Sequence, residues 1–240
     1  MLSTEHIEFN WQKLVDLIKA INPRLVCILE KFEDNVVNVN DAINPVIYPG
    51  LKNAPAGVFN HHSYEGGLVE HLLEMWDTHV KIYKVLELGV IDTNIHLRSD
   101  EILEVIIIHD LHKGYCYYRY PTFKEDQDFI QSPTTTGYFK RSNLDHVKMA
   151  GDNGVSFWMC QLAGFKLSSL KSLNAILCSE GGYAKSPPEW QTVLAKYVYI
   201  LDEISSNVLS RLTEGNVFNI RDKANTQSLS DMFLKDYSKD

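Results

Sequence analysis

Hydrophobic residues recur every three to four positions along much of the chain. Within residues 5–32, two such groups are separated by Asn22-Pro23, which predicts two short helices. A further periodic run predicts a helix that begins after Gly66-Gly67. Others predict helices over residues 99–111, 144–164, 168–178 and 188–212. Ser99 is the expected N-cap of the second of these helices, and Pro187-Pro188 is the expected start of the last. The pattern therefore predicts a mainly helical protein, with helices in both halves of the chain.

Three segments lack this periodicity. Residues 35–60 are rich in turn formers, which predicts an irregular connection over the surface. Residues 114–144 are aromatic and polar, a composition suited to a long loop or hairpin beside a site. After Gly215 the periodicity fades, so we expect a C-terminal tail that is loosely packed or lies along the body.

Composition limits the classes of protein that need to be considered. The hydrophobic content of 45% is that of an ordinary globular core, and the formal net charge of −8 argues against a broad basic surface for nucleic acid. The four cysteines are widely spaced, with no CxxC pair and no secretory leader, which fits a reducing cytoplasm. No apolar stretch approaches the roughly 20 residues of a membrane-spanning helix. We therefore expect a cytoplasmic protein without a membrane partner.

Two of the nine histidines lie next to acidic residues inside strongly apolar helices, in the pairs Glu70-His71 and His109-Asp110. Burying such a pair costs several kcal/mol unless another group compensates its charge. A divalent metal ion fits best, and Asp202 on a third predicted helix adds a carboxylate. Imidazole and carboxylate together suit Mn, Fe, Co, Ni, Zn or, with more oxygen ligands, Mg. For His71 alone, the alternative is a core histidine that is hydrogen-bonded to a carbonyl.

The run HHSYEGGLVEHL over residues 61–72, followed by HDLHK over 109–113 and then by Asp202, resembles the HD superfamily of metal-dependent phosphohydrolases. Its first motif is most similar to the HD domains of 3′-to-5′ exoribonucleases. The resemblance covers roughly residues 50–210 and implies an all-α HD-domain helical bundle, with a long loop or hairpin after the HD motif. It divides the chain into an N-terminal helical arm packed on the core, the HD phosphohydrolase domain and a C-terminal tail, over residues 1–50, 51–214 and 215–240.

The resemblance also implies roles for individual residues. It makes His71, His109, Asp110 and Asp202 the metal ligands, with Asp110 also catalytic. Lys113 takes the place of a lysine near the phosphate, and its spacing from Asp110 puts both on nearly one helical face. The alternative for Lys113 is a solvated lysine at a helix C-terminus.

Other candidates surround these residues. His61 or His62 could donate a proton to the leaving group or only cap a loop, and His112 could carry a proton or be a surface residue. Tyr115 and Arg119 could stack on a base and contact phosphate, although aromatic loop residues more often pack against the body. Arg141 could also line the pocket.

The chain departs from the family after the fourth helix. Residues 178–182, CSEGG, stand where exoribonuclease-like members have His-His-Gly, so we expect one metal ion per chain. Asp145-His146 is the candidate substitute for the missing histidines. The glutamate that HD-type 5′-nucleotidases place after the HD pair is also absent, since Lys113-Gly114 occupies that neighbourhood.

Three functions follow as hypotheses. The first is a metal-dependent phosphohydrolase that uses metal-activated water to cleave a phosphoester or phosphoanhydride of a nucleotide, such as a deoxynucleoside triphosphate, a monophosphate or a cyclic nucleotide. The second is a 3′-to-5′ exonuclease on single-stranded RNA or DNA. The third is a catalytically weak HD domain that binds a nucleotide or a protein partner. The acidic chain disfavours extended duplex nucleic acid, and a homo-oligomer is left open.

Overall fold

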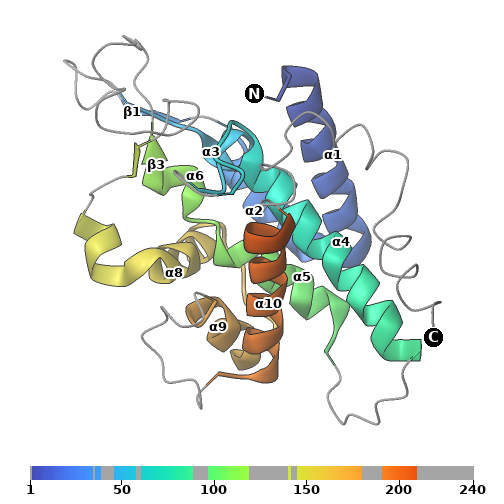
Figure 1. The fold of residues 1–240 in the computed structure, drawn as a ribbon. Helices are drawn as coiled ribbons and strands as arrows, with labels where there is room; N and C mark the ends of the chain where they lie inside the picture. Colours follow the sequence, from blue (N-terminus) through green and yellow to red (C-terminus); the bar gives the residue numbers. More distant parts are fainter. Residues whose placement is uncertain are drawn as a thin grey trace.

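Helices dominate the part of the chain that the structure, a computed structural model, describes: residues 2–34, 36–38, 46–57, 61–88, 97–118, 140–141, 145–179 and 191–209. The helices are α1 (Thr4–Ile21), α2 (Val26–Phe32), α3 (Gly50–Asn53), α4 (Gly67–Leu88), α5 (Ser99–His109), α6 (Lys113–Cys116), α8 (Asp145–Leu162), α9 (Leu170–Leu177) and α10 (Val193–Glu203). A 3₁₀ turn, Pro23–Leu25, precedes α2, and a π-helical turn, Ile204–Leu209, extends α10. The expected all-α class is confirmed (Figure 1).

The N-terminal helices form where the sequence predicts them. Ser3 caps α1 by accepting a hydrogen bond from the His6 backbone N–H, and the helix ends at Ile21, with Asn22 as its C-cap directly before Pro23. Its buried face packs against α4 and α5. The predicted arm therefore lies on the central helices, while its separation from the rest as a unit stays a prediction.

α5 forms the centre of the bundle. Every residue from Ile102 to Ile108 is at most 2% exposed, and α5 contacts α1, α4, α8, α9 and α10. Its N-cap is Arg98 instead of Ser99, which is the first helical residue and lies near the ring of His79. The centrally placed α5 explains why its periodic pattern is apolar on nearly all sides.

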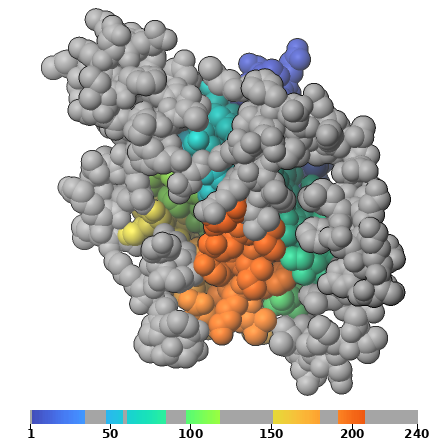
Figure 2. Space-filling view, viewed as in Figure 1, coloured from blue at the N-terminus to red at the C-terminus, as the bar shows by residue number. Residues whose placement is uncertain are grey.

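α4 and α10 lie against α5 and against each other, and Figure 2 shows α10 reaching the surface beside α4. α10 begins at Val193, later than expected from Pro187-Pro188, because Thr192 caps it by accepting from the Ala195 N–H. The residues from 180 to 190 lie outside the described residues. Among the described helices, none is long and apolar enough to cross a membrane.

Two short antiparallel strand pairs accompany the described helices. β1 (Val36–Asn38) pairs with β2 (Val46–Tyr48), so the predicted irregular connection over 35–60 contains β-structure and the helix α3. The valines of β1 and the valine and isoleucine of β2 favour this pairing. β3 (Tyr117–Tyr118) pairs with β4 (Lys140–Arg141), which joins the two ends of the predicted loop or hairpin. The residues between β3 and β4, and the predicted tail over 215–240, lie outside the described residues.

Candidate metal centre

Four side chains from three helices meet where α4, α5 and α10 approach one another. His71 lies on α4, His109 ends α5, Asp110 follows it, and Asp202 lies on α10. The Nε2 atom of His71 is 3.1 Å from Oδ1 of Asp202 and 3.6 Å from Oδ2 of Asp110. The Nε2 atom of His109 is 3.4 Å from the same Asp110 oxygen. The structure thus brings His71, His109 and Asp110 into one group of possible metal ligands, with the carboxylate of Asp202 beside His71.

The other ring nitrogen of each histidine is held by the protein. Nδ1 of His109 lies 2.8 Å from the carbonyl oxygen of Ile106, and Nδ1 of His71 lies 2.9 Å from Oγ of Ser205. Ser205 donates its hydroxyl hydrogen to Oε2 of Glu74 over 3.0 Å. These contacts aim both Nε2 atoms at the carboxylates, an arrangement found around metal-ligating histidines.

The residues present fit a divalent metal ion. The Nε2 atoms of His71 and His109 are buried and have no hydrogen-bond partner in the described part of the structure. A buried polar atom without a partner costs about 1–3 kcal/mol, which a cation bound to its lone pair would remove. Two imidazoles with two carboxylates form a donor set that such an ion accepts. His71, His109, Asp110 and Asp202 are therefore the residues that would hold it.

Charge compensation shapes the site even without an ion. Burial by itself would raise the pKa of Asp110, but His109, Lys113 and His71 outweigh burial and hold that pKa well below its usual value. Burial would likewise lower the pKa of Lys113, but the carboxylate of Asp110, 2.5 Å from its Nζ, keeps that pKa above the ordinary value. Lys113 therefore carries its charge inside the site, and it is not the solvated lysine of the alternative reading.

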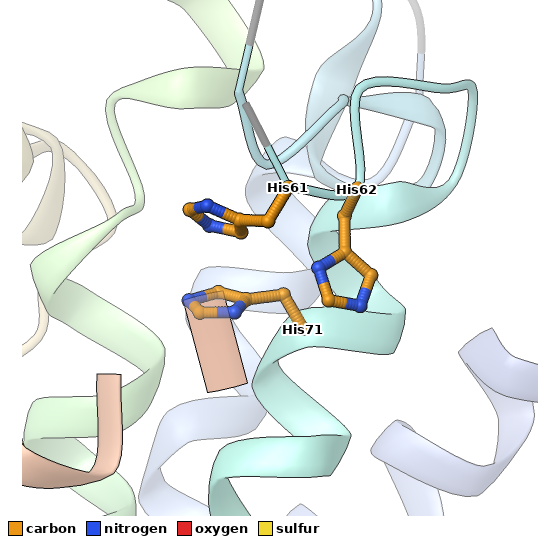
Figure 3. A group of neighbouring side chains, drawn as sticks. All are labelled: His61, His62 and His71. Carbon is orange, nitrogen blue, oxygen red and sulfur yellow. The ribbon is translucent and has the colours of Figure 1, made fainter. Parts of the chain in front are cut away.

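Two further histidines cover the site from the turn before α4. Figure 3 shows His61 lying over the ring of His71, with His62 beside them. The ring centroids of His61 and His71 are 4.8 Å apart. Nε2 of His62 lies 3.2 Å from Oε2 of Glu74, so Glu74 contacts both His62 and the Ser205 hydroxyl that holds His71.

Other candidates lie away from this centre or outside the described residues. His112 is buried, not at the surface, with Nδ1 3.1 Å from Oγ of Ser156, which donates to the carbonyl oxygen of His109. The ring of Tyr115 packs between those of Phe32 and Tyr48, the packing alternative to base stacking.

The remaining candidates are only partly described. Arg119 lies outside the described residues, as do the side chains of Arg141, Asp145 and His146. Cys178 is buried at the C-terminal end of α9 and belongs to neither group of possible metal ligands among the described residues.

Sequence analysis missed Glu74, Ser205 and Ser156. Two of these had a local signal: Glu74 follows His71 by three residues and Ser205 follows Asp202 by three, so each lies on the same helical face as a ligand. Ser156 comes from α8 and reaches α5 only through tertiary packing.

Comparison with known proteins identifies one informative relative. A curated protein of Methanocaldococcus jannaschii, dihydroneopterin 2′,3′-cyclic phosphate phosphodiesterase, is 30% identical to the chain over 138 residues. The match covers 53% of the chain, and the chain spans only 50% of the relative. No protein-family model matches the chain, and no solved structure matches it significantly. The likeness is thus to a protein named as a phosphodiesterase, and it does not support the expected similarity to exoribonucleases.

Proposed function

We propose that the chain is a metal-dependent phosphodiesterase that opens the cyclic phosphate of a small nucleotide-like substrate. The observation that carries the proposal is the meeting of His71, His109, Asp110 and Asp202, with both histidine Nε2 atoms buried beside carboxylates and without a hydrogen-bond partner among the described residues. The name of the curated relative supports a phosphodiester over a triphosphate substrate. A cation bound by these residues would lower the pKa of a water molecule and polarise a phosphoryl oxygen.

The reaction adds water across one ester bond. The water oxygen bonds to phosphorus, the bond from phosphorus to one ring oxygen breaks, and that oxygen takes up the proton that the water loses. The product is a phosphomonoester, and no free phosphate is released. An acyclic nucleotide chain or a triphosphate would give a different product, so the product identifies the reaction.

The chain's own residues place the phosphate and hold the charges. Lys113 presents an ammonium beside Asp110, where it can donate to a phosphate oxygen. Asp202 and Asp110 remain carboxylates because their pKa values are held low, against the effect of burial, by His71 and, for Asp110, by His109 and Lys113. Ser205 and Glu74 fix the ring of His71, and Ser156 connects the backbone of His109 to the ring of His112.

His62 and His112 differ in how their ring nitrogens are placed for carrying a proton. Nε2 of His62 faces Glu74, so a neutral His62 that donates there has only an acceptor nitrogen left for the site. His112 contacts Ser156 and lies 3.8 Å from Asp152, so it is placed to orient the end of α5. We therefore propose His112 as a positioning residue, with Arg119 and Arg141 as the outer substrate-binding candidates.

A substrate panel with two variants tests the proposal. The full chain is supplied with Mn²⁺ and given a 2′,3′-cyclic nucleotide, a deoxynucleoside triphosphate or single-stranded RNA. We expect ring opening of the cyclic phosphate alone, and we expect Asp110→Ala to abolish it. Asp77→Ala is the control, because Asp77 is an exposed residue of α4 whose ion pair is with Lys13. Shortening of RNA, or an Asp110→Ala variant as active as the wild type, would contradict the proposal.

A further inference from the structure

His61, His62 and His71 form a second group of possible metal ligands beside the proposed centre. One nitrogen of each lies within 4.8 Å of the others. Figure 3 shows the two rings from the turn before α4 facing the ring of His71 on the helix. The proposed ligand set of His71, His109, Asp110 and Asp202 uses neither His61 nor His62.

Each of these two histidines has one buried ring nitrogen that the described part of the structure leaves without a hydrogen bond. Nε2 of His61 and Nδ1 of His62 are buried and have no hydrogen-bond partner among the described residues. On His62, the other nitrogen faces the carboxylate of Glu74, which favours the tautomer that leaves Nδ1 unprotonated.

The backbone holds this pair in place at a cost. His62 has φ 49°, the left-handed conformation, which costs a residue with a Cβ about 1–2 kcal/mol. A Cβ on Gly67 would lie 2.1 Å from the carbonyl oxygen of His62, so the turn packs directly on the start of α4. Strain of this kind persists where the surrounding structure enforces it, often at functional sites.

His71 cannot serve two ions from its free nitrogen. Its Nδ1 is taken by Ser205, and its Nε2 faces Asp202 and Asp110. Resting on the proposed function, we infer that His61 and His62 hold a second divalent cation beside the first, with water and phosphate oxygens as its other ligands. Imidazole ligands suit Zn²⁺, Co²⁺, Ni²⁺ and Fe²⁺, whereas Mg²⁺ requires oxygen ligands.

The charges around the site make this second ion dependent on phosphate. Among the described residues, Glu74, Asp110 and Asp202 bring three carboxylates to the two groups of histidines, and Lys113, beside Asp110, brings an ammonium. One divalent cation balances that excess of negative charge, so a second adds uncompensated positive charge. A phosphate anion between the two cations offsets it. Inorganic phosphate should therefore tighten binding of the second cation.

Counting bound metal tests the inference without an activity assay. The chelator-stripped full chain is dialysed against Co²⁺ with and without inorganic phosphate, and metal per chain is measured by elemental analysis. Four variants are compared: His61→Ala, His61→Ala with His62→Asn, Asp202→Asn, and His6→Ala as an exposed-histidine control. Asparagine tolerates the left-handed backbone of His62, and circular dichroism checks that each variant folds.

We expect two Co²⁺ ions per chain in the wild type and in His6→Ala with phosphate. We expect one ion in the double variant, and only one ion when Mg²⁺ replaces Co²⁺. A wild type that binds a single ion, or a double variant that still binds two, overturns the inference. If that single ion is lost in Asp202→Asn and kept in the double variant, the proposed function stands while the second cation does not. No bound ion in the wild type overturns both.

Discussion

Nδ1 of His71 lies 2.9 Å from Oγ of Ser205, a contact that links α4 to the π-helical turn after α10. Ser205 is fully buried, and its hydroxyl group donates a hydrogen bond to Glu74. The same carboxylate contacts His62, so one chain of polar contacts orients a proposed ligand of each cation. These polar contacts therefore connect the two groups of histidines.

Ser205→Ala should weaken binding of the first cation by roughly 10- to 100-fold, because the ring of His71 loses the partner that fixes its orientation. Competition with a coloured chelator measures this affinity. Ser206→Ala, one residue further along, is the matched control, because the Ser206 hydroxyl accepts from the side-chain amide of Asn207. Equal losses in the two variants would argue that the effect is a general loosening of the turn.

Lys113→Met should lower kcat/KM for a phosphodiester by roughly 10- to 100-fold, since a charge-assisted hydrogen bond contributes about 1.5–3 kcal/mol. Steady-state kinetics checks this at fixed metal concentration. Lys52→Met is the control: Lys52 is largely buried and pairs with Glu8 and Glu33 away from the site, so its loss should reduce stability and leave kcat/KM unchanged. Unaltered kinetics in Lys113→Met would remove Lys113 from the substrate site.

Gly67→Ala should destabilise the fold by about 3 kcal/mol or more, because its Cβ would meet the carbonyl oxygen of His62 at 2.1 Å. It should also lower the metal content by displacing His61 and His62. A Cβ at Gly164 would meet nothing within 4 Å. Gly164→Ala therefore costs only the backbone strain of a φ of 71°, about 1 kcal/mol. Thermal unfolding and metal analysis together separate the two effects, and a Gly67→Ala variant with wild-type stability would contradict this packing.

His79 should make stability depend on pH. It is 2% exposed and lies 3.0 Å from the Tyr197 hydroxyl, and burial lowers its pKa from 6.5 to about 4. Between pH 4 and pH 6.5 the unfolded chain binds a proton at His79 more readily than the folded chain does. The contribution of His79 to the free energy of unfolding is therefore full above pH 6.5 and is lost as the pH falls through 4.

Relative to a His79→Gln variant, the wild type should lose about 2 kcal/mol of unfolding free energy between pH 7 and pH 5. Urea unfolding at both pH values measures this difference. Parallel pH profiles in the two proteins would show that His79 is not the titrating group.

Local sequence pattern was sufficient for most of the described helices, though not for the four-residue α3 and α6, and for the proposed ligands. Apolar residues at helical spacing predicted α1, α2, α4, α5, α8, α9 and α10, because burying one face of a helix requires that spacing. His71, His109, Asp110 and Asp202 could be selected because ionisable residues in apolar helices need a compensating partner. Short strands such as β1 and β2 escaped prediction because three-residue segments carry too little pattern.

Only the tertiary structure decided which side chains meet. Ser205 reaches His71, and Ser156 reaches the end of α5, through helix packing that brings distant segments together. The same packing buries His112 and holds the ring of Tyr115 between two others, which the sequence left open. Periodicity reports which face of a helix is buried, but the partner of a buried polar atom depends on how the helices cross, and that relationship is not local.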